Sequence, residues 1–167
     1  SASAPTRIAV TGTTLLGTGS IPFYVGPGVT GVSLNGGRFA GRSDSAAIYL
    51  DAESAGAAIR NVAFDITTPR EQIAVDGSAR NLISGNRFVL RGRGGVFLYR
   101  NCGEDGVIRH QTPSGNVITD NVFSGSTARS VVVGSRNGGR RYCGDDRGYP
   151  FGSSADDGDL ATGNTVQ

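Results

Sequence analysis

The apolar residues of this chain recur at a fixed pair of spacings. Three apolar residues separated by five and then nine positions occur in four successive segments. The four sets are Leu34, Phe39, Ile48; Ile59, Phe64, Ile73; Ile83, Phe88, Phe97; and Ile118, Phe123, Val132. Val10, Leu15 and Tyr24 extend the series backwards, and Ala161 and Val166 begin a sixth set. The early middle members follow one another after 24 or 25 residues, a period typical of a solenoid.

The apolar segments have the length and composition of strands. They are short and rich in Val, Ile and Phe, and Gly or Asp follows them. Residues five apart in an unbroken strand face opposite sides, so a corner must separate the first two members of each set. Asn61, Gly85 and Asp120 stand at these positions, and Asn, Asp and Gly tolerate the left-handed conformation of a sharp turn. The pattern predicts an all-β chain of stacked coils.

Asparagines also recur at fixed offsets from the apolar residues. Asn86, Asn121 and Asn164 each stand two positions before the second apolar residue of a set. Asn81 and Asn116 stand two positions before the first. Stacked strands lie about 4.8 Å apart, so aligned amides are placed to hydrogen-bond along the stack. The sequence therefore predicts two asparagine ladders.

Two segments carry a family resemblance. Ile-Ser-Gly-Asn-Arg-Phe (83–88) and Ile-Thr-Asp-Asn-Val-Phe (118–123) resemble the repeat unit of right-handed parallel β-helix proteins. That superfamily includes pectate-lyase-like enzymes, polysaccharide epimerases and phage tailspikes, and the resemblance is to its secreted bacterial members. It covers about Val10 to Val166 but includes no catalytic motif, because the matching residues are core and corner residues.

The resemblance implies one domain over residues 1–167. The fold expected for the chain is a right-handed parallel β-helix of about six coils with two long loops on one side. Its expected internal stack consists of Phe39, Phe64, Phe88, Phe123 and Val166.

The repeat is interrupted twice at the same point of the coil. The gap from the third apolar residue to the next set is 10 or 11 residues in the early coils. It lengthens to 21 residues after Phe97 and to 29 after Val132. The loops 99–114 and 134–159 should therefore lie together on one side, where repeat proteins commonly bind ligands.

These loops hold the candidate catalytic and ligand-binding residues. His110 and Arg109 are candidates for acid–base chemistry, the alternative being that they tie their loop to the coil. Asp145 and Asp146 are candidates for the paired carboxylates of a glycosidase. The candidate carboxylate clamps are Arg100, Arg109, Arg140 and Arg141, and the candidate tyrosines for sugar contact are Tyr99, Tyr142 and Tyr149.

The same loops contain both cysteines and an acidic cluster. Cys102 and Cys143 are expected to form a disulfide, the alternative being two reduced, partly buried thiols. Asp156, Asp157 and Asp159 offer the oxygen ligands that Ca²⁺ prefers, the alternative being solvated loop acids.

One further alignment of charged residues suggests a structural role. Asp51, Asp76 and Arg100 each stand three positions after the third apolar residue of a set. The spacing predicts that they stack outward and that Asp76 and Arg100 form an exposed ion pair.

The charge balance restricts the partner. Sixteen arginines against fourteen acids give a net charge of +2, without the basic excess of a general nucleic-acid-binding protein. No apolar run reaches the length of a membrane span. The small residues 1–5 fit the start of a secreted protein, so we expect an extracellular or cell-surface location.

Two functions remain open at this point. One is a carbohydrate-active protein that binds an acidic polysaccharide and, if it is an enzyme, cleaves it as a lyase or a glycoside hydrolase. The other is a non-catalytic structural or adhesive module, such as part of a surface protein or tail fibre. The protein is expected to be a monomer or an end-to-end dimer, with a lid formed by residues 148–151 over the last coil.

Overall fold

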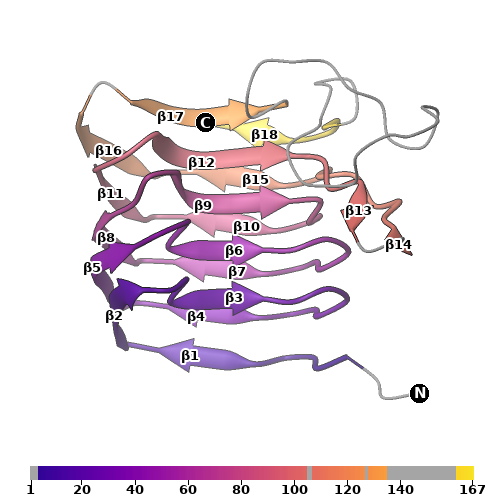
Figure 1. Ribbon diagram of the computed structural model, residues 1–167, viewed down its shortest axis with the longest axis horizontal. Helices are drawn as coiled ribbons and strands as arrows, with labels where there is room; N and C mark the ends of the chain where they lie inside the picture. Colours follow the sequence, from indigo (N-terminus) through magenta and orange to yellow (C-terminus); the bar gives the residue numbers. More distant parts are fainter. Residues whose placement is uncertain (1–3, 105–106, 127, 135–160) are drawn as a thin grey trace.

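The computed structural model describes residues 4–104, 107–126, 128–134 and 161–167. Three parallel sheets run the length of the stack (Figure 1). Sheet I consists of β1 (Ala9–Thr11), β4 (Ser33–Asn35), β7 (Ala58–Arg60), β10 (Leu82–Ser84), β15 (Val117–Thr119) and β18 (Thr165–Val166). Sheet II consists of β2 (Thr14–Gly19), β5 (Arg38–Ser43), β8 (Ala63–Thr67), β11 (Arg87–Leu90) and β16 (Val122–Gly125). Sheet III consists of β3 (Phe23–Val25), β6 (Ile48–Leu50), β9 (Glu71–Asp76), β12 (Gly94–Tyr99) and β17 (Arg129–Val133).

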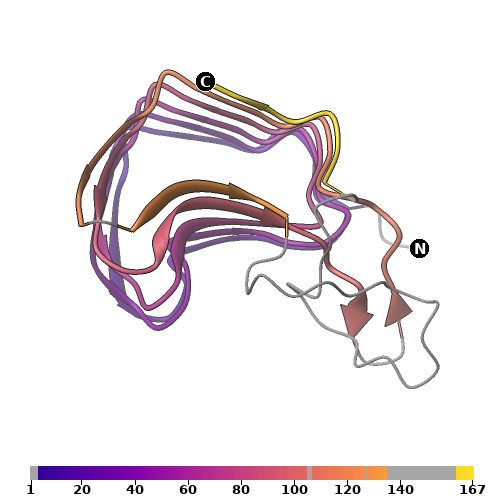
Figure 2. The ribbon, with the colours of Figure 1, turned by 90° about the horizontal axis from the view of Figure 1, so that it is seen from above.

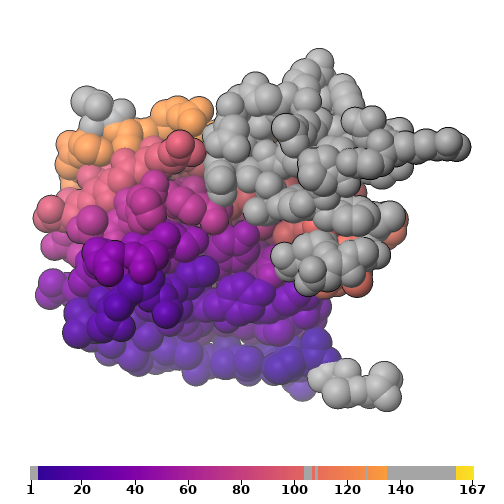
Figure 3. Space-filling model, viewed as in Figure 1, coloured from indigo at the N-terminus to yellow at the C-terminus, as the bar shows by residue number. Residues whose placement is uncertain are grey.

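Each coil contributes one strand to each sheet, so the fold is a parallel β-helix. The colours of Figure 3 follow the chain upward through the stacked coils, from indigo to orange. In the described residues, sheets II and III hold five strands each, so the number of complete coils is lower than the count of about six coils that the sequence predicts. No helix that could cross a membrane occurs in the part of the chain that the structure describes.

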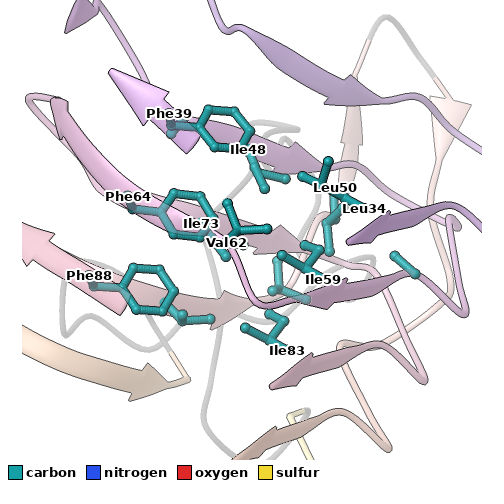
Figure 4. Packing of buried hydrophobic residues seen from close by; sticks show 14 of the residues in the cluster. Leu34, Phe39, Ile48, Leu50, Ile59, Val62, Phe64, Ile73, Ile83 and Phe88 are labelled. Carbon is teal, nitrogen blue, oxygen red and sulfur yellow. The ribbon is translucent and has the colours of Figure 1, made fainter. Parts of the chain in front are cut away.

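The first two apolar columns are confirmed. Leu34, Ile59, Ile83 and Ile118 pair in sequence across sheet I, and Phe39, Phe64, Phe88 and Phe123 pair across sheet II. The phenylalanine rings are stacked, with centroids 4.9, 4.6 and 4.8 Å apart along the column. Figure 4 shows the rings of Phe39, Phe64 and Phe88 facing aliphatic side chains of sheets I and III across the interior. The core is therefore one continuous cluster inside the coils.

The third predicted column is wrong at Tyr24, Phe97 and Val132. Ile48 and Ile73 point inward as predicted, but their partners in the neighbouring strands are Phe23 and Val96. The connection between sheets II and III is one residue shorter in the first, fourth and fifth coils. A shift of one residue moves a side chain to the opposite face of a strand. The predicted third members of those coils consequently lie on the outer face of sheet III.

The prediction for Val166 is also wrong. Val166 pairs with Ile118 in sheet I and is 47% exposed, so it does not continue the phenylalanine stack. The reason is an ambiguity in the sequence. Both asparagine columns stand two residues before an apolar residue, so Asn164 fits either one.

Both predicted asparagine ladders are present, but Asn164 belongs to the ladder of Asn81 and Asn116 and not to that of Asn86 and Asn121. The Nδ2 group of Asn81 donates to Oδ1 of Asn116 at 2.9 Å, and that of Asn116 donates to Oδ1 of Asn164 at 3.0 Å. In the second ladder, the Nδ2 group of Asn86 donates to Oδ1 of Asn121 at 3.0 Å. The predicted corners are confirmed by positive φ angles at Asn61 (54°), Gly85 (67°) and Asp120 (56°). The ladders hold successive corners in register.

Candidate functional site

The outer face of sheet III is unusual because much of it is buried. All six residues of β9 and all six of β12 are buried, although alternate residues point away from the interior. Phe97 and Tyr99 form a second apolar cluster on this face with Ala46 and Ala74. The Arg129 guanidinium lies 5.3 Å from the Phe97 ring centroid. We call the outer face of sheet III, from β3 to β12, the sheet III face.

The lower half of the sheet III face carries two tyrosine–carboxylate pairs. The Tyr24 hydroxyl donates to Oδ2 of Asp51 in the next coil, and the Tyr49 hydroxyl donates in the same way to Asp76. The ring centroids of Tyr24 and Tyr49 are 5.9 Å apart. Tyr24 is 55% exposed, so this column presents aromatic surface whose hydroxyl groups are held by carboxylates.

The prediction that Arg100 joins the stack of Asp51 and Asp76, in an exposed ion pair with Asp76, is wrong. Asp51 is 7% exposed and Asp76 is 0% exposed. The residue opposite Asp76 in the next strand is Tyr99, not Arg100, because the register of β12 differs by one residue from the prediction. The Nδ2 group of Asn101 donates to both aspartates, at 3.2 Å to Asp51 and 3.1 Å to Asp76. These carboxylates therefore belong to a buried hydrogen-bond network.

The upper half of the sheet III face centres on Glu71. Its Oε1 atom accepts hydrogen bonds from Nη2 of Arg70 at 2.9 Å and from the Tyr99 hydroxyl at 2.5 Å. Among the described residues, nothing hydrogen-bonds to its other carboxylate oxygen, which is buried. The Arg70 guanidinium also lies 5.6 Å from the centroid of the Tyr49 ring and so connects the two halves.

Tyr99 is held in its neutral form. Burial raises the pKa of Tyr99 well above its ordinary value, and the charges of Asp76 and Glu71 raise it further. Because Tyr99 has no exposed surface, its ring offers nothing for a sugar to stack on, contrary to the role proposed from the sequence. Its hydroxyl instead serves as a hydrogen-bond donor inside the network.

We expect the folded protein to lose stability above about pH 10 through Tyr99. The unfolded chain releases the Tyr99 proton there while the folded chain retains it, so the free energy of unfolding falls by up to about 1.4 kcal/mol per pH unit from this group. Tyr99→Phe should show a shallower decline. Urea unfolding at pH 8, 10 and 11 measures it, and equal slopes for the two proteins would contradict the assignment.

The first insertion is fixed to the coils beneath it. It connects β12 to β15 and contains the hairpin of β13 (Gly103–Glu104) and β14 (Val107–Ile108). After the hairpin, Nη1 of Arg109 approaches Oε2 of Glu53 at 3.3 Å, and Nε2 of Gln111 donates to the Ser54 and Gly77 carbonyls at 2.7 and 2.8 Å. The insertion is thus anchored on the corner between sheets III and I.

The sequence-predicted residues of the first insertion have different environments. Arg100 is buried, and its Nη2 group donates to the carbonyl of Arg109 at 3.1 Å. The His110 side chain is exposed, and its backbone N–H donates to Oε1 of Glu53 at 3.4 Å. These contacts agree with the structural role considered for this segment. An acid–base role for His110 stays a prediction.

Most residues of the second insertion lie outside the described residues. The predictions that concern them are those for Arg140, Arg141, Tyr142, Cys143, Asp145, Asp146, Tyr149, Asp156, Asp157 and Asp159, together with the lid of residues 148–151. Both insertions connect sheet III to sheet I, as predicted. Cys102 is buried at the base of the first insertion. Within the described ranges, no group of three or more His, Cys, Asp or Glu side chains could hold a metal ion.

The sequence does contain a signal for the tyrosine–carboxylate pairs. Tyr24 and Asp51 are 27 residues apart, and so are Tyr49 and Asp76. This offset is one repeat plus two residues, so it places both partners on the same face of neighbouring strands. The 27-residue offset is not recognised as a signal when Tyr24 is predicted to point into the interior.

Comparisons with known proteins do not identify the chain. No protein-family model, curated protein or solved structure matches it.

Proposed function

We propose that this protein binds an acidic polysaccharide through the sheet III face and the insertions 99–114 and 134–159. The observation that supports this most directly is the aromatic column of Tyr24, which is exposed, and Tyr49, which is partly buried. Their hydroxyls are fixed by Asp51 and Asp76, and Asn101 at the base of the first insertion bonds to both aspartates. Rigid aromatic groups with fixed polar partners form good binding surfaces because little entropy is lost on binding.

We expect an acidic ligand because of the arginines of the second insertion, and not because of the charges on the sheet III face. The buried carboxylates of Asp51, Glu71 and Asp76 already accept hydrogen bonds from tyrosine hydroxyls. The Arg70 guanidinium beside them is already paired with Glu71 at 2.9 Å. Arg140 and Arg141 of the second insertion remain predicted clamps for a carboxylate. An arginine is suited to bidentate contact with a carboxylate.

Binding is a better-supported proposal than cleavage. Tyr99 and Arg100, which the sequence suggested as site residues, take part in the internal network. Arg109 is paired with Glu53. His110 is the remaining candidate acid or base of the first insertion. A lyase would reveal itself by absorbance near 235 nm on incubation with a uronate polymer, because its products carry a conjugated double bond.

Titration calorimetry with oligogalacturonate tests the proposal. Tyr24→Ala should weaken binding about tenfold, equivalent to 1.4 kcal/mol, because it removes the most exposed ring of the column. Tyr24→Phe keeps the ring and should bind nearly as tightly. Leu16→Ala removes a side chain that is 66% exposed on sheet II and serves as the control. Unchanged affinity in Tyr24→Ala, or equal affinity for neutral dextran, would refute the proposal.

We further propose an extracellular location, with Cys102 and Cys143 joined and with membership of the pectate-lyase-like superfamily. Thiol titration of the denatured, unreduced protein should detect no free thiols. A bridge across a loop of this length stabilises a fold by several kcal/mol in the chain-entropy estimate. Reduction should lower the melting temperature accordingly, and two free thiols per chain would contradict the pairing.

The alternative function is a structural or adhesive module. It is favoured by apolar side chains of the first coil, where Ile8 is 42% and Leu16 is 66% exposed. Light scattering over a range of concentrations distinguishes the two. Self-association without binding to any polysaccharide would favour the module.

A further inference from the structure

Three arginines gather at the corner between sheets I and II. Arg60 ends β7, just before the corner of its coil. Arg38 begins β5 in the preceding coil, and Arg87 begins β11 in the following one. All three side chains are exposed. We call Arg38, Arg60 and Arg87 the arginine corner.

The pairing of sheet II sets the geometry of the arginine corner. Arg38 and Arg87 both pair with Ala63, one from each side, so their Cα atoms are two strand spacings apart, roughly 10 Å. The short side chain of Ala63 leaves the space between them open. A hollow of about 340 Å³ lies on the Arg87 side of Ala63, lined by Asn61, Val62, Ala63, Gly85 and Arg87.

The charges of the arginine corner are not neutralised by the described part of the protein. The salt bridges in the described part of the protein join Arg42 to Asp44, Arg70 to Glu71, Arg91 to Asp65, and Arg109 to Glu53. None of them involves the arginine corner. The nearest acid along the same line of corners is Asp120, in the coil after Gly85, where it accepts a hydrogen bond from the Thr119 hydroxyl at 3.2 Å.

We propose that the arginine corner is a second binding surface, which takes the anionic groups of a linear polysaccharide. It goes beyond the proposed function, because it shares no residue with the sheet III face. Figure 2 shows the β13–β14 hairpin on the side of the solenoid opposite the corner between sheets I and II. Carboxylate or sulfate groups repeated along a sugar chain match cations held at fixed intervals on a rigid stack.

A polysaccharide fits this surface better than a nucleic acid does. Single strands are bound by aromatic side chains that stack on bases, and the lining of the hollow contains none. Binding to duplex DNA depends on neutralising many phosphates, whereas this surface offers three cations and the chain has a net charge of only +2.

The test compares two double variants of equal charge. Arg38→Gln with Arg87→Gln removes two members of the arginine corner, and Arg7→Gln with Arg80→Gln removes two exposed arginines elsewhere. The probes are sulfated dextran fragments, oligogalacturonate, neutral dextran and a short DNA duplex, each titrated calorimetrically at two salt concentrations. The first variant should bind the charged polysaccharides about tenfold more weakly. Its salt dependence should also fall by one to two units of slope, about one unit per lost contact.

The control variant should change affinity by less than about twofold, which is within the range of long-range charge effects at physiological salt. Asp120→Asn should tighten binding, because it removes a negative charge from the same line of corners. Equal losses in both double variants would overturn the proposal, as would tighter binding to DNA than to either polysaccharide. If affinity falls in the Arg38→Gln, Arg87→Gln variant but not in Tyr24→Ala, the arginine corner is supported and binding at the sheet III face is refuted. If affinity falls in Tyr24→Ala but not in the Arg38→Gln, Arg87→Gln variant, binding at the arginine corner is refuted.

Discussion

Replacing Phe64 with alanine is expected to lower the free energy of unfolding by about 3–5 kcal/mol. Phe64 is 1% exposed and stacks between Phe39 and Phe88, with ring centroids 4.9 and 4.6 Å away. The neighbouring rings are fixed by strands on both sides, so the cavity left by the missing ring cannot collapse easily. Urea unfolding at neutral pH measures the loss.

Val166→Ala provides the control for this experiment. Val166 lies in β18 and is 47% exposed, so its truncation should cost less than about 0.5 kcal/mol. Similar losses for the two variants would mean that the phenylalanine column is not the core of the β-helix.

Replacing Asn86 with leucine, a side chain of similar size, is expected to cost about 2–4 kcal/mol. The Oδ1 atom of Asn86 accepts from the Val62 N–H at 3.0 Å, and its Nδ2 group donates to the Ile59 carbonyl at 3.0 Å. Leucine leaves both of these buried backbone groups without their partner. Because they lie at the corner, the variant should also loosen the register of neighbouring coils.

Asn35→Ala is the matched control in the same kind of corner. Asn35 is exposed and accepts one side-chain hydrogen bond, from Asn61 at 3.1 Å. Its loss should cost less than about 1 kcal/mol, because water replaces the partner. Hydrogen exchange at the Val62 amide gives an independent measurement. Protection that persists in Asn86→Leu would show that the ladder does not hold this corner.

The sequence predicts the stacked architecture well because the spacing between the first two apolar columns is constant where their side chains pack in the core. The spacing of five between Ile59 and Phe64, or Ile83 and Phe88, spans a corner whose length never varies. The next connection does vary by one residue, and periodicity alone does not indicate where it shortens. Tyr24, Phe97 and Val132 were assigned to the wrong face for that reason.

The candidate site was less predictable from the sequence. The long loops and their fixed corner follow from the interrupted repeat, and the contacts of Arg109 and Gln111 agree with an anchored insertion. The network of Glu71, Asp76 and Tyr99 depends on which face of a strand each residue occupies, so the error in register concealed it. The spacing predicts exposed side chains for Asp51 and Asp76, whereas tyrosine and asparagine partners allow these carboxylates to be buried.

The two proposed surfaces make the protein a rigid stack with separate contacts on opposite sides. Neither surface requires a conformational change, because both are held by parallel pairing between neighbouring coils. A linear polymer engaged at both surfaces would gain avidity without new contacts, provided that it can span the distance between them.

Mapping of backbone amide shifts on isotope-labelled protein, titrated with oligogalacturonate, tests the central claim most directly. Binding to the sheet III face predicts saturable shifts at Tyr24, Tyr49, Arg70 and residues 107–111, with a separate group around the arginine corner. Shifts confined to other surfaces, or none at concentrations that saturate the calorimetric signal, would contradict polysaccharide binding at the sheet III face.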